Sequence, residues 1–143
     1  MSGLAELMLT NGFTVSGSDS GESDITRHLT SLGAKIYYPQ AAENINDGTD
    51  YVIYTAAIHE DNPELMEVRR RNIPAYTRAD FLGTIMQNYA SSIAISGTHG
   101  KTTTTGMISQ ILLNTGLDPT ISIGGILPVI NGNFRCGSNN IFI

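Results

Sequence analysis

The feature that most constrains this chain is a short apolar run followed by a glycine-containing turn and a helix-forming segment. Ile93-Ala-Ile95 predicts a buried parallel strand, Gly97-Thr-His-Gly100 a tight turn, and Lys101-Thr102 the start of a helix. This order is typical of phosphate-binding loops. Glycine lets backbone N–H groups approach an anion closely, and the dipole of the following helix favours phosphate. The sequence therefore predicts a nucleotide site, and an ordinary strand-to-helix turn is the alternative.

Individual side chains in this loop have expected roles. Lys101 is placed to reach the β- and γ-phosphates of a nucleotide, and the Thr102 hydroxyl is placed to ligate Mg²⁺. The usual first glycine of the motif is absent, because Ile95 stands five positions before Gly100 and the loop reads G-x-x-G-K-T. We interpret His99 as a residue that shapes the loop rather than as a catalytic base.

Composition and charge narrow the class of protein. The net charge is −5, and the one basic run, Arg69-Arg-Arg71, falls on a predicted helix where a solvated face is expected, so nucleic acid is not an expected partner. The single Cys136 cannot form an intrachain disulfide, which suits a reducing cytosol. No apolar stretch approaches the ~20 residues that span a bilayer, and no signal-peptide pattern opens the chain. We therefore predict a cytoplasmic protein without membrane insertion.

Short apolar runs that alternate with helical periodicity predict an α/β fold. The expected strands before the loop are residues 13–19, 35–38, 50–54 and 73–76, and helices are expected at 1–10, 25–32, 62–72 and 77–86. A polar stretch at 87–91 predicts a linker, with a domain boundary near residue 90.

The expectations differ for the segments after the loop. One helix face there carries Met107, Ile108, Ile111 and Leu112 and ends at Gly116, with strands at 120–123 and 139–143. Residues 129–137 look like a loop with Phe134 and Arg135 exposed or facing a ligand. Gly124-Gly125 predicts a turn or a close approach to a ligand.

Two further segments are candidate ligand contacts because ligands of open parallel sheets bind beyond the carboxyl ends of the strands. Asp19 ends the strand predicted at 13–19, where an acid can meet a ribose hydroxyl, although capping of the next helix fits equally well. Thr55-Ala-Ala57 follows the strand predicted at 50–54.

Several of these stretches together resemble the Mur ligases. Gly97-Thr-His-Gly-Lys-Thr-Thr-Thr104 is similar to the ATP loop of that family, and the histidine in it points to the alanine-adding branch. The other matching stretches are Met1-Ser-Gly-Leu-Ala-Glu6, Val15-Ser-Gly-Ser-Asp19, Tyr54-Thr-Ala-Ala-Ile58, Asn62-Pro-Glu64, residues 74–80, Gly124-Gly-Ile-Leu127 and Asn131-Gly-Asn133.

The resemblance implies a ligase of peptidoglycan synthesis that uses ATP and Mg²⁺. It would join L-alanine to the lactyl carboxylate of UDP-N-acetylmuramate through an acyl phosphate. The implied architecture is α/β: a truncated Rossmann-like parallel-sheet domain that binds the UDP-sugar over residues 1–90, followed by the beginning of a P-loop domain that binds ATP over residues 91–143.

The resemblance implies a role for each candidate residue, taken from the family residue at the matching position. Lys101 would stabilise the transferring phosphoryl group, and Thr102 would bind Mg²⁺. The remaining residues that would hold ATP phosphates are Gly97, Thr98, His99, Gly100 and Thr103. The residues that would lie near the UDP end of the sugar nucleotide are Ser18, Asp19, Thr55, Ala56 and Ala57.

The chain departs from the family pattern at both ends. The first strand and glycine-rich loop that the family places before Met1 are absent, as is the Mg²⁺-binding glutamate expected after Ile143. We therefore expect the 143-residue chain by itself to be inactive and marginally folded. The alternatives are a ligase that adds recycled murein tripeptide to the same UDP-sugar, a nucleotide-binding module without catalysis, and an NAD-binding oxidoreductase domain, against which the phosphate loop argues. The sequence predicts no particular oligomeric state.

Overall fold

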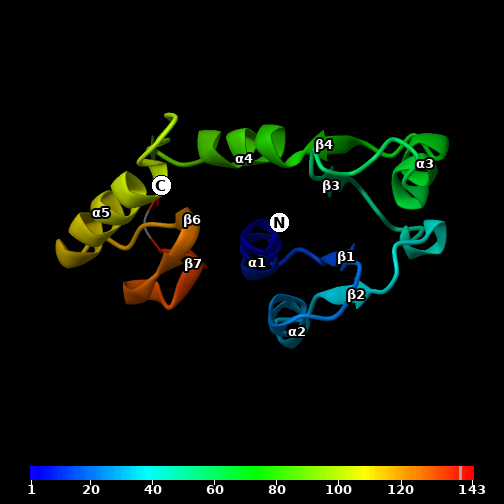
Figure 1. Cartoon of the computed structure of the whole chain (residues 1–143), viewed down its shortest axis with the longest axis horizontal. Coiled ribbons are helices and arrows are strands. Elements are labelled where there is room, and N and C mark those ends of the chain that lie inside the picture. Colours follow the sequence, from blue (N-terminus) through cyan, green and yellow to red (C-terminus); the bar gives the residue numbers. More distant parts are fainter. Residues whose placement is uncertain (139) are drawn as a thin grey trace. The chain divides into compact units, whose positions relative to one another are not determined.

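The computed structural model describes residues 1–138 and 140–143 (Figure 1). The chain divides into two compact units, Met1–Gly83 and Thr84–Ile143, and the division falls inside helix α4 (Arg78–Gln87). Each unit combines helices with parallel strands, which confirms the predicted α/β class. The assignment of residues 1–90 and 91–143 to separate domains stays a prediction.

The first unit contains two pairs of short parallel strands (Figure 1). The pairs are β1 (Ser16–Ser18) with β2 (Lys35–Tyr37), and β3 (Val52–Tyr54) with β4 (Ala75–Thr77). Each strand overlaps a segment in which we predicted one. A helix joins the members of each pair, α2 (Asp24–Ser31) in the first and α3 (Pro63–Arg70) in the second. Parallel neighbours require such a crossover connection.

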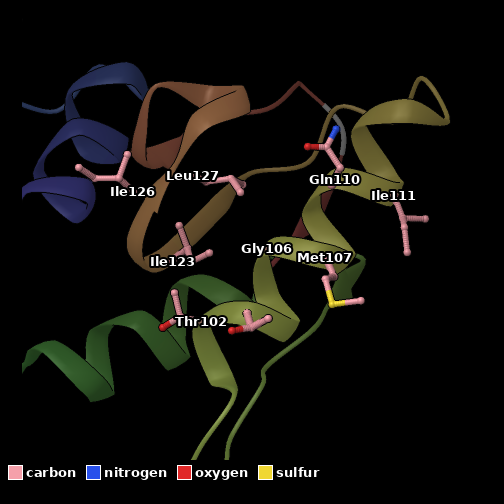
Figure 2. A pocket seen from close by; sticks show the side chains of 9 residues that line it. Thr102, Gly106, Met107, Gln110, Ile111, Ile123, Ile126 and Leu127 are labelled. Carbon is pink, nitrogen blue, oxygen red and sulfur yellow. The ribbon is translucent and has the colours of Figure 1, made fainter.

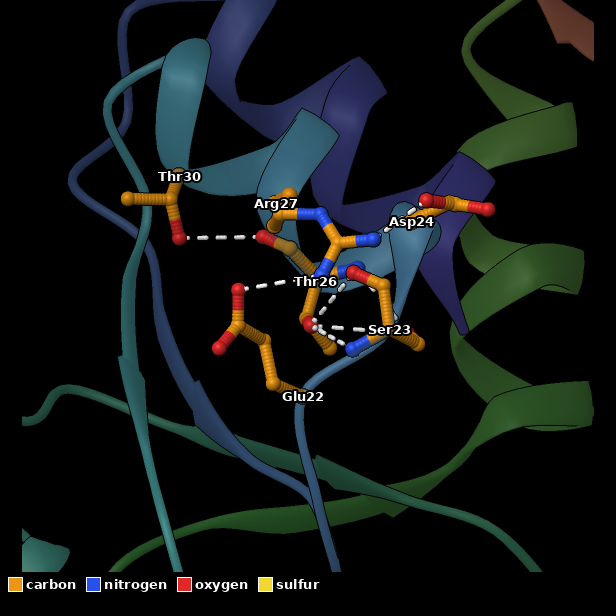
Figure 3. A network of polar contacts seen from close by, with 6 residues as sticks. All are labelled: Glu22, Ser23, Asp24, Thr26, Arg27 and Thr30. Carbon is orange, nitrogen blue, oxygen red and sulfur yellow. Dashed lines mark hydrogen bonds and ion pairs between the residues drawn. The ribbon is translucent and has the colours of Figure 1, made fainter.

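Helix α2 begins with a reciprocal cap, drawn in Figure 3. The Ser23 hydroxyl accepts from the Thr26 amide at 3.2 Å, and the Thr26 hydroxyl accepts from the Ser23 amide at 2.8 Å. Two donors that the helix leaves without intrahelical partners are thereby satisfied. Because Ser23 is the cap, the alternative role of Asp19 as the cap of this helix is wrong.

Helix α3 begins at the Asn62-Pro63 pair, as the sequence predicts. The Asn62 side-chain oxygen accepts from the amides of Glu64 at 3.0 Å and Leu65 at 3.1 Å. Proline fits the first helical position because its missing N–H would have no intrahelical partner there. Leu65 and Val68 then bury the inner face of the helix.

The basic run at the end of α3 is paired with carboxylates. Arg69 lies 2.7 Å from Glu60, and Arg70 lies 2.6 Å from Glu67. Arg71 bonds both Glu67 and Asp47. Hydrogen bonds from Arg70 and Arg71 lower the pKa of Glu67 to about 2. The three guanidinium groups are therefore balanced by neighbouring acids.

Other apolar contacts of the first unit come from α1 (Ser2–Thr10) and from an aromatic group. Leu4 and Leu7 of α1 are buried. Tyr51 lies 5.6 Å from Phe81, measured between ring centroids, and 6.5 Å from Tyr76. No described residue of α4 is fully buried. Phe81 is only half-buried against this aromatic group.

The second unit is built around β8 (Ile141–Phe142). This strand pairs in parallel with β5 (Ser91–Ser92) on one side. On the other side it meets the start of β6 (Ile121–Leu127), where the Ser122 amide donates to the Ile143 carbonyl at 2.8 Å. An antiparallel strand, β7 (Gly132–Arg135), follows β6 through the short helix η2 (Pro128–Ile130).

Helix α5 (Lys101–Asn114) covers this sheet through a small apolar core. Ile121, Ile123 and Ile143 are buried, and Ile108 and Leu112 of the helix pack against them. The predicted helix face was partly wrong, because Met107 and Ile111 are 63% and 60% exposed. With about 3.6 residues per turn, they lie on the opposite side of the helix from the buried Thr105 and Ser109.

Two other expectations for this unit were wrong. The run before the loop is only partly buried: residues 91–92 alone form β5, Ile93 and Ala94 are exposed, and Ile95 packs half-buried against the core. Within the described residues β5 has β8 as its only strand partner. The segment expected to be a loop contains β7, with Phe134 buried at 8% exposure because it faces the core.

Arg135 also differs from its expected role, because it is part of a network that fastens the chain before β8. Its guanidinium is ion-paired with Asp118 and donates to the Pro119 carbonyl at 3.3 Å. The Ser138 amide donates to the other Asp118 oxygen at 2.7 Å. Hydrogen bonds from Ser138 and then from Arg135 lower the pKa of Asp118 to about 2.

Candidate functional site

The loop between β5 and α5 is shaped by two glycines with positive φ. Gly100 has a φ of +77°, in the left-handed region, and it is the residue that caps α5. Gly97 has a φ of +150°, and a Cβ there would lie 3.5 Å from the His99 carbonyl oxygen. Side chains rarely adopt these backbone angles, which explains why glycine stands at both positions.

Lys101 folds back over this loop. Its Nζ donates to the Gly97 carbonyl and, at 3.3 Å, to the Thr98 carbonyl. The ammonium group is exposed and held by backbone oxygens, without a carboxylate among its hydrogen-bond partners in the described residues. The positive charge is therefore available to an anion that enters the loop.

The start of α5 is also suited to an anion. Within the described residues no side chain caps this helix, and its first turn contains no acid. The first amide groups of a helix have no intrahelical acceptor, and the helix dipole gives this end a partial positive charge. An anion that carries several oxygens, such as a phosphate, fits this set of donors.

Thr102 supplies an oxygen beside these donors. The residue is exposed, and among the described residues its hydroxyl has no hydrogen-bond partner. In the described chain no group of three His, Cys, Asp or Glu residues could hold a metal ion. Mg²⁺ keeps phosphate oxygens and water among its ligands, and the Ser or Thr of a phosphate-binding loop supplies one protein oxygen to it, so Thr102 fits as one of its protein ligands.

The other loop residues have less specific surroundings. His99 and Thr103 are both exposed. Thr103 lines an open apolar groove of about 500 Å³ between α5 and β6. Met107 and Ile111 of α5 and Ile123 and Leu127 of β6 are among the residues that line this groove, and their side chains are drawn in Figure 2.

The predicted UDP-end residues lie in the first unit, at the carboxyl ends of its strands. Ser18 is the last residue of β1, and its hydroxyl donates to Glu64 at 2.6 Å. Asp19 follows it, and its side chain accepts from the amide of Ser20 at 2.7 Å. Thr55 follows β3 and accepts from the Ile58 amide at 3.2 Å, in a turn that also exposes Ala56 and Ala57.

The sequence analysis did not predict a role for Glu64, which bonds to Ser18 at the carboxyl end of β1. Besides Ser18, its carboxylate accepts from the Asn44 side chain at 2.7 Å, and Asn44 also donates to the Pro39 carbonyl at 3.0 Å. One acid thus connects β1, the short helix η1 (Ala42–Asn44) and the start of α3. Its place in the first turn after a capping asparagine was the only local signal, because the partners are 46 and 20 residues away.

Comparison with curated proteins gives consistent relatives. The chain is 59% identical over its whole length to the UDP-N-acetylmuramate–L-alanine ligase of Agathobacter rectalis and 55% identical to that of Clostridium novyi. It spans 31% of the length of each of these relatives. No described helix is long and apolar enough to cross a membrane.

Solved structures agree on the fold. The UDP-N-acetylmuramate-alanine ligase of Thermotoga maritima matches 99% of this chain with a TM-score of 0.88 at 34% identity, and the match covers 34% of that chain. A murein peptide ligase from Psychrobacter arcticus gives a TM-score of 0.88 at 24% identity, over 99% of this chain and 34% of that one, which supports the fold alone.

A family comparison gives the same assignment. The sequence model described as "Mur ligase family, catalytic domain" matches residues 1–90, which is more than half of the 143 residues and includes the strand ends around Ser18 and Thr55. The loop at Gly97–Gly100 lies outside the matched residues, beyond residues 91–96. The chain belongs to the Mur ligase family.

Proposed function

We propose that this chain provides the ATP-binding loop and part of the UDP-sugar domain of a ligase that joins L-alanine to UDP-N-acetylmuramate. The observation that carries the proposal is the start of α5, which no described side chain caps and over which Lys101 is held by the carbonyls of Gly97 and Thr98. The choice of amino acid and sugar nucleotide rests on relatives named for that reaction, at 59% and 55% identity.

The proposed work of the loop is electrostatic. When ATP is bound, it supplies the phosphoryl group that converts the lactyl carboxylate into an acyl phosphate. The backbone amides at Gly97–Gly100 and the first turn of α5 would hold the phosphate oxygens, and Lys101 would neutralise charge that develops on the transferring group. For this it must leave the carbonyls of Gly97 and Thr98, which bind it through two hydrogen bonds.

We assign the remaining contacts by position. Thr102 would ligate Mg²⁺ through its hydroxyl, and Thr98, His99 and Thr103 would complete the surroundings of the phosphates. Ser18, Asp19 and the 55–57 turn would meet the UDP end of the sugar nucleotide, with Glu64 holding Ser18 in place. Residues 1–90 would then be the sugar-nucleotide part and residues 91–143 the ATP part. Because the proposed reaction consumes ATP, we propose that the protein acts in the cytoplasm.

The test is release of phosphate by the complete product of the reading frame that encodes these residues, with ATP, Mg²⁺ and UDP-N-acetylmuramate. We expect release with L-alanine and a loss of at least about 100-fold in Lys101→Ala, the scale of removing one charge-stabilising donor. Lys35→Ala is the matched control, because this exposed lysine lies on β2, outside the loop.

Other outcomes separate the alternatives. Release with murein tripeptide instead of L-alanine would identify the recycling ligase. Tight nucleotide binding without release in either case would identify a binding module, and binding of NAD in place of ATP would identify the oxidoreductase alternative.

A further inference from the structure

Strand β6 contains an irregularity next to the phosphate loop. Ser122 is paired with Phe134 and Leu127 with Gly132, so four residues of β6 lie opposite a single residue of β7. Extra residues of this kind make a strand bulge and change the direction of its backbone. The bulge contains Gly124 and Gly125, and both approach the first turn of α5.

Both glycines face one side chain, Thr102. A Cβ on Gly125 would lie 3.1 Å from the Thr102 methyl carbon Cγ2, which is closer than ordinary contact. A Cβ on Gly124 would lie 3.5 Å from the Thr102 hydroxyl oxygen, an ordinary contact distance. Neither glycine has a positive φ, so the backbone angles do not require glycine. The close approach of Thr102 explains the glycine at position 125.

The orientation of the Thr102 side chain is open to change. Threonine in a helix divides between two χ1 rotamers, because its hydroxyl can also bond a carbonyl of the preceding turn. Thr105 illustrates the second possibility, since its hydroxyl donates to the Lys101 carbonyl at 2.8 Å. The Thr102 hydroxyl has no such partner among the described residues. The space over Gly125 is thus what accommodates the methyl group in the observed rotamer.

We propose that Gly125 is a positioning residue for the Mg²⁺ ligand: by lacking a side chain it leaves room for the Thr102 methyl group and so keeps the hydroxyl directed for metal binding. This inference rests on the proposed function, because Thr102 matters as a ligand only if the loop binds Mg²⁺ with a nucleotide. It adds a residue on a different element, 23 positions further along the chain, to the proposed ATP site.

The experiment measures how the affinity for a fluorescent ADP depends on Mg²⁺ concentration, in the complete product of the reading frame. The variants are Gly125→Ala, Thr102→Ser, the double variant, and Gly132→Ala as the control. Gly132 lies on the partner strand β7, and a Cβ there would meet nothing closer than 3.9 Å. Thermal unfolding of each variant shows whether a change in metal binding is accompanied by a loss of stability.

We expect Gly125→Ala to raise the Mg²⁺ concentration for half-maximal binding by about tenfold, the scale on which groups behind a metal ligand act. Thr102→Ser retains the hydroxyl and lacks Cγ2, so the double variant should return to the value of Thr102→Ser alone. Gly132→Ala should match the wild type. A return to the Thr102→Ser value would be specific for the contact between residue 125 and the Thr102 methyl group. A general effect of alanine in β6 would persist in the double variant.

Two results would overturn the inference: an unchanged Mg²⁺ requirement in Gly125→Ala, or a raised one that Thr102→Ser fails to relieve. If Gly125→Ala does not fold, the double variant decides, because it must fold if the Thr102 methyl is the obstacle. A wild-type protein that binds no nucleotide would overturn the proposed function and this inference with it. A protein that binds nucleotide with Mg²⁺ but ignores the Gly125 substitution would overturn the inference alone.

Discussion

At the scale of single residues, Ser109 is a polar residue whose side chain is buried. It is fully buried on α5, and its hydroxyl is the one buried side-chain oxygen or nitrogen of the described residues without a hydrogen-bond partner. Burying an unpaired hydroxyl costs about 1–3 kcal/mol. Alanine would remove that cost and is also the better helix former.

We therefore predict that Ser109→Ala raises the free energy of unfolding by about 1 kcal/mol, measured by urea denaturation. The matched control is Thr105→Val, one turn earlier on the same helix. It loses the 2.8 Å bond to the Lys101 carbonyl and should lower stability by about 1 kcal/mol. A Ser109→Ala variant less stable than the wild type would mean that the hydroxyl has a partner the prediction ignores.

Gly137 is a residue where main chain, rather than a side chain, fills the space. A Cβ there would lie 2.1 Å from the Asp118 carbonyl oxygen and 2.3 Å from the Pro119 carbonyl carbon. These atoms cannot rotate away as the Thr102 methyl can beside Gly125. We predict that Gly137→Ala lowers the free energy of unfolding by about 3 kcal/mol, whereas Gly132→Ala costs less than about 1 kcal/mol. Equal losses in both variants by urea denaturation would contradict the packing argument.

At the scale of elements, the Asp118 network connects the chain before β8 to the start of β6. The Asp118 pKa is lowered from its ordinary value of 3.8 to about 2 by Ser138 and then Arg135. A carboxyl group with a lowered pKa in the folded state favours folding above its unfolded pKa, and this contribution is lost as pH falls through the folded pKa. The network should therefore weaken between about pH 4 and pH 2.

We predict that Asp118→Asn lowers the thermal midpoint at pH 7 and that the difference from the wild type shrinks as pH falls from about 4 to about 2. Other acids titrate in the same range, so the quantity to follow is the difference between the two proteins rather than either midpoint. Arg135→Gln is a partner control and should give a smaller loss, because Ser138 still donates to the carboxylate. A difference that stays constant over this range would show that the Asp118 charge does not stabilise the fold.

Elements with local signals could be predicted from the sequence, and those that depend on distant partners could not. α3 has its Asn62-Pro63 start, and the loop before α5 has Gly97 and Gly100, so both were found where the structure has them. β7 was missed because Asn and Gly are typical turn residues, while its pairing with β6 depends on the bulge at Gly124-Gly125.

The same division applies to the candidate site. Lys101 and Thr102 follow from a short motif, and the structure adds how the loop carbonyls hold the lysine. Glu64 and Gly125 act on residues 46 and 23 positions away, a separation that no window along the sequence covers. Burial of Ile93 was wrongly predicted for a related reason, because the number of strands beside β5 is a property of the sheet.

At the scale of the whole molecule, the fully buried side chains are unevenly divided between the two units. Of the six largest fully buried side chains among the described residues, only Val68 belongs to Met1–Gly83. The others, which include Ile121 and Phe142, belong to Thr84–Ile143. Strands β1 to β4 form isolated pairs, whereas β8 has β5 on one side and β6 on the other. Two-stranded sheets are marginally stable unless a helix or further strands cover them.

Hydrogen exchange of the 143-residue chain should report this difference. Amides with few buried neighbours open locally at low free energy, whereas those of a packed core exchange only through larger unfolding. We predict that amides of β8 and the first half of β6 exchange at least about tenfold more slowly than those of β1 and β2, a gap of ~1.4 kcal/mol. Mass spectrometry of peptic peptides measures both in one sample, and α3 is an internal reference because Val68 is 1% exposed. Equal or faster exchange at β8 would contradict the prediction, since it would mean that the buried apolar residues around Phe142 do not form a cooperative core.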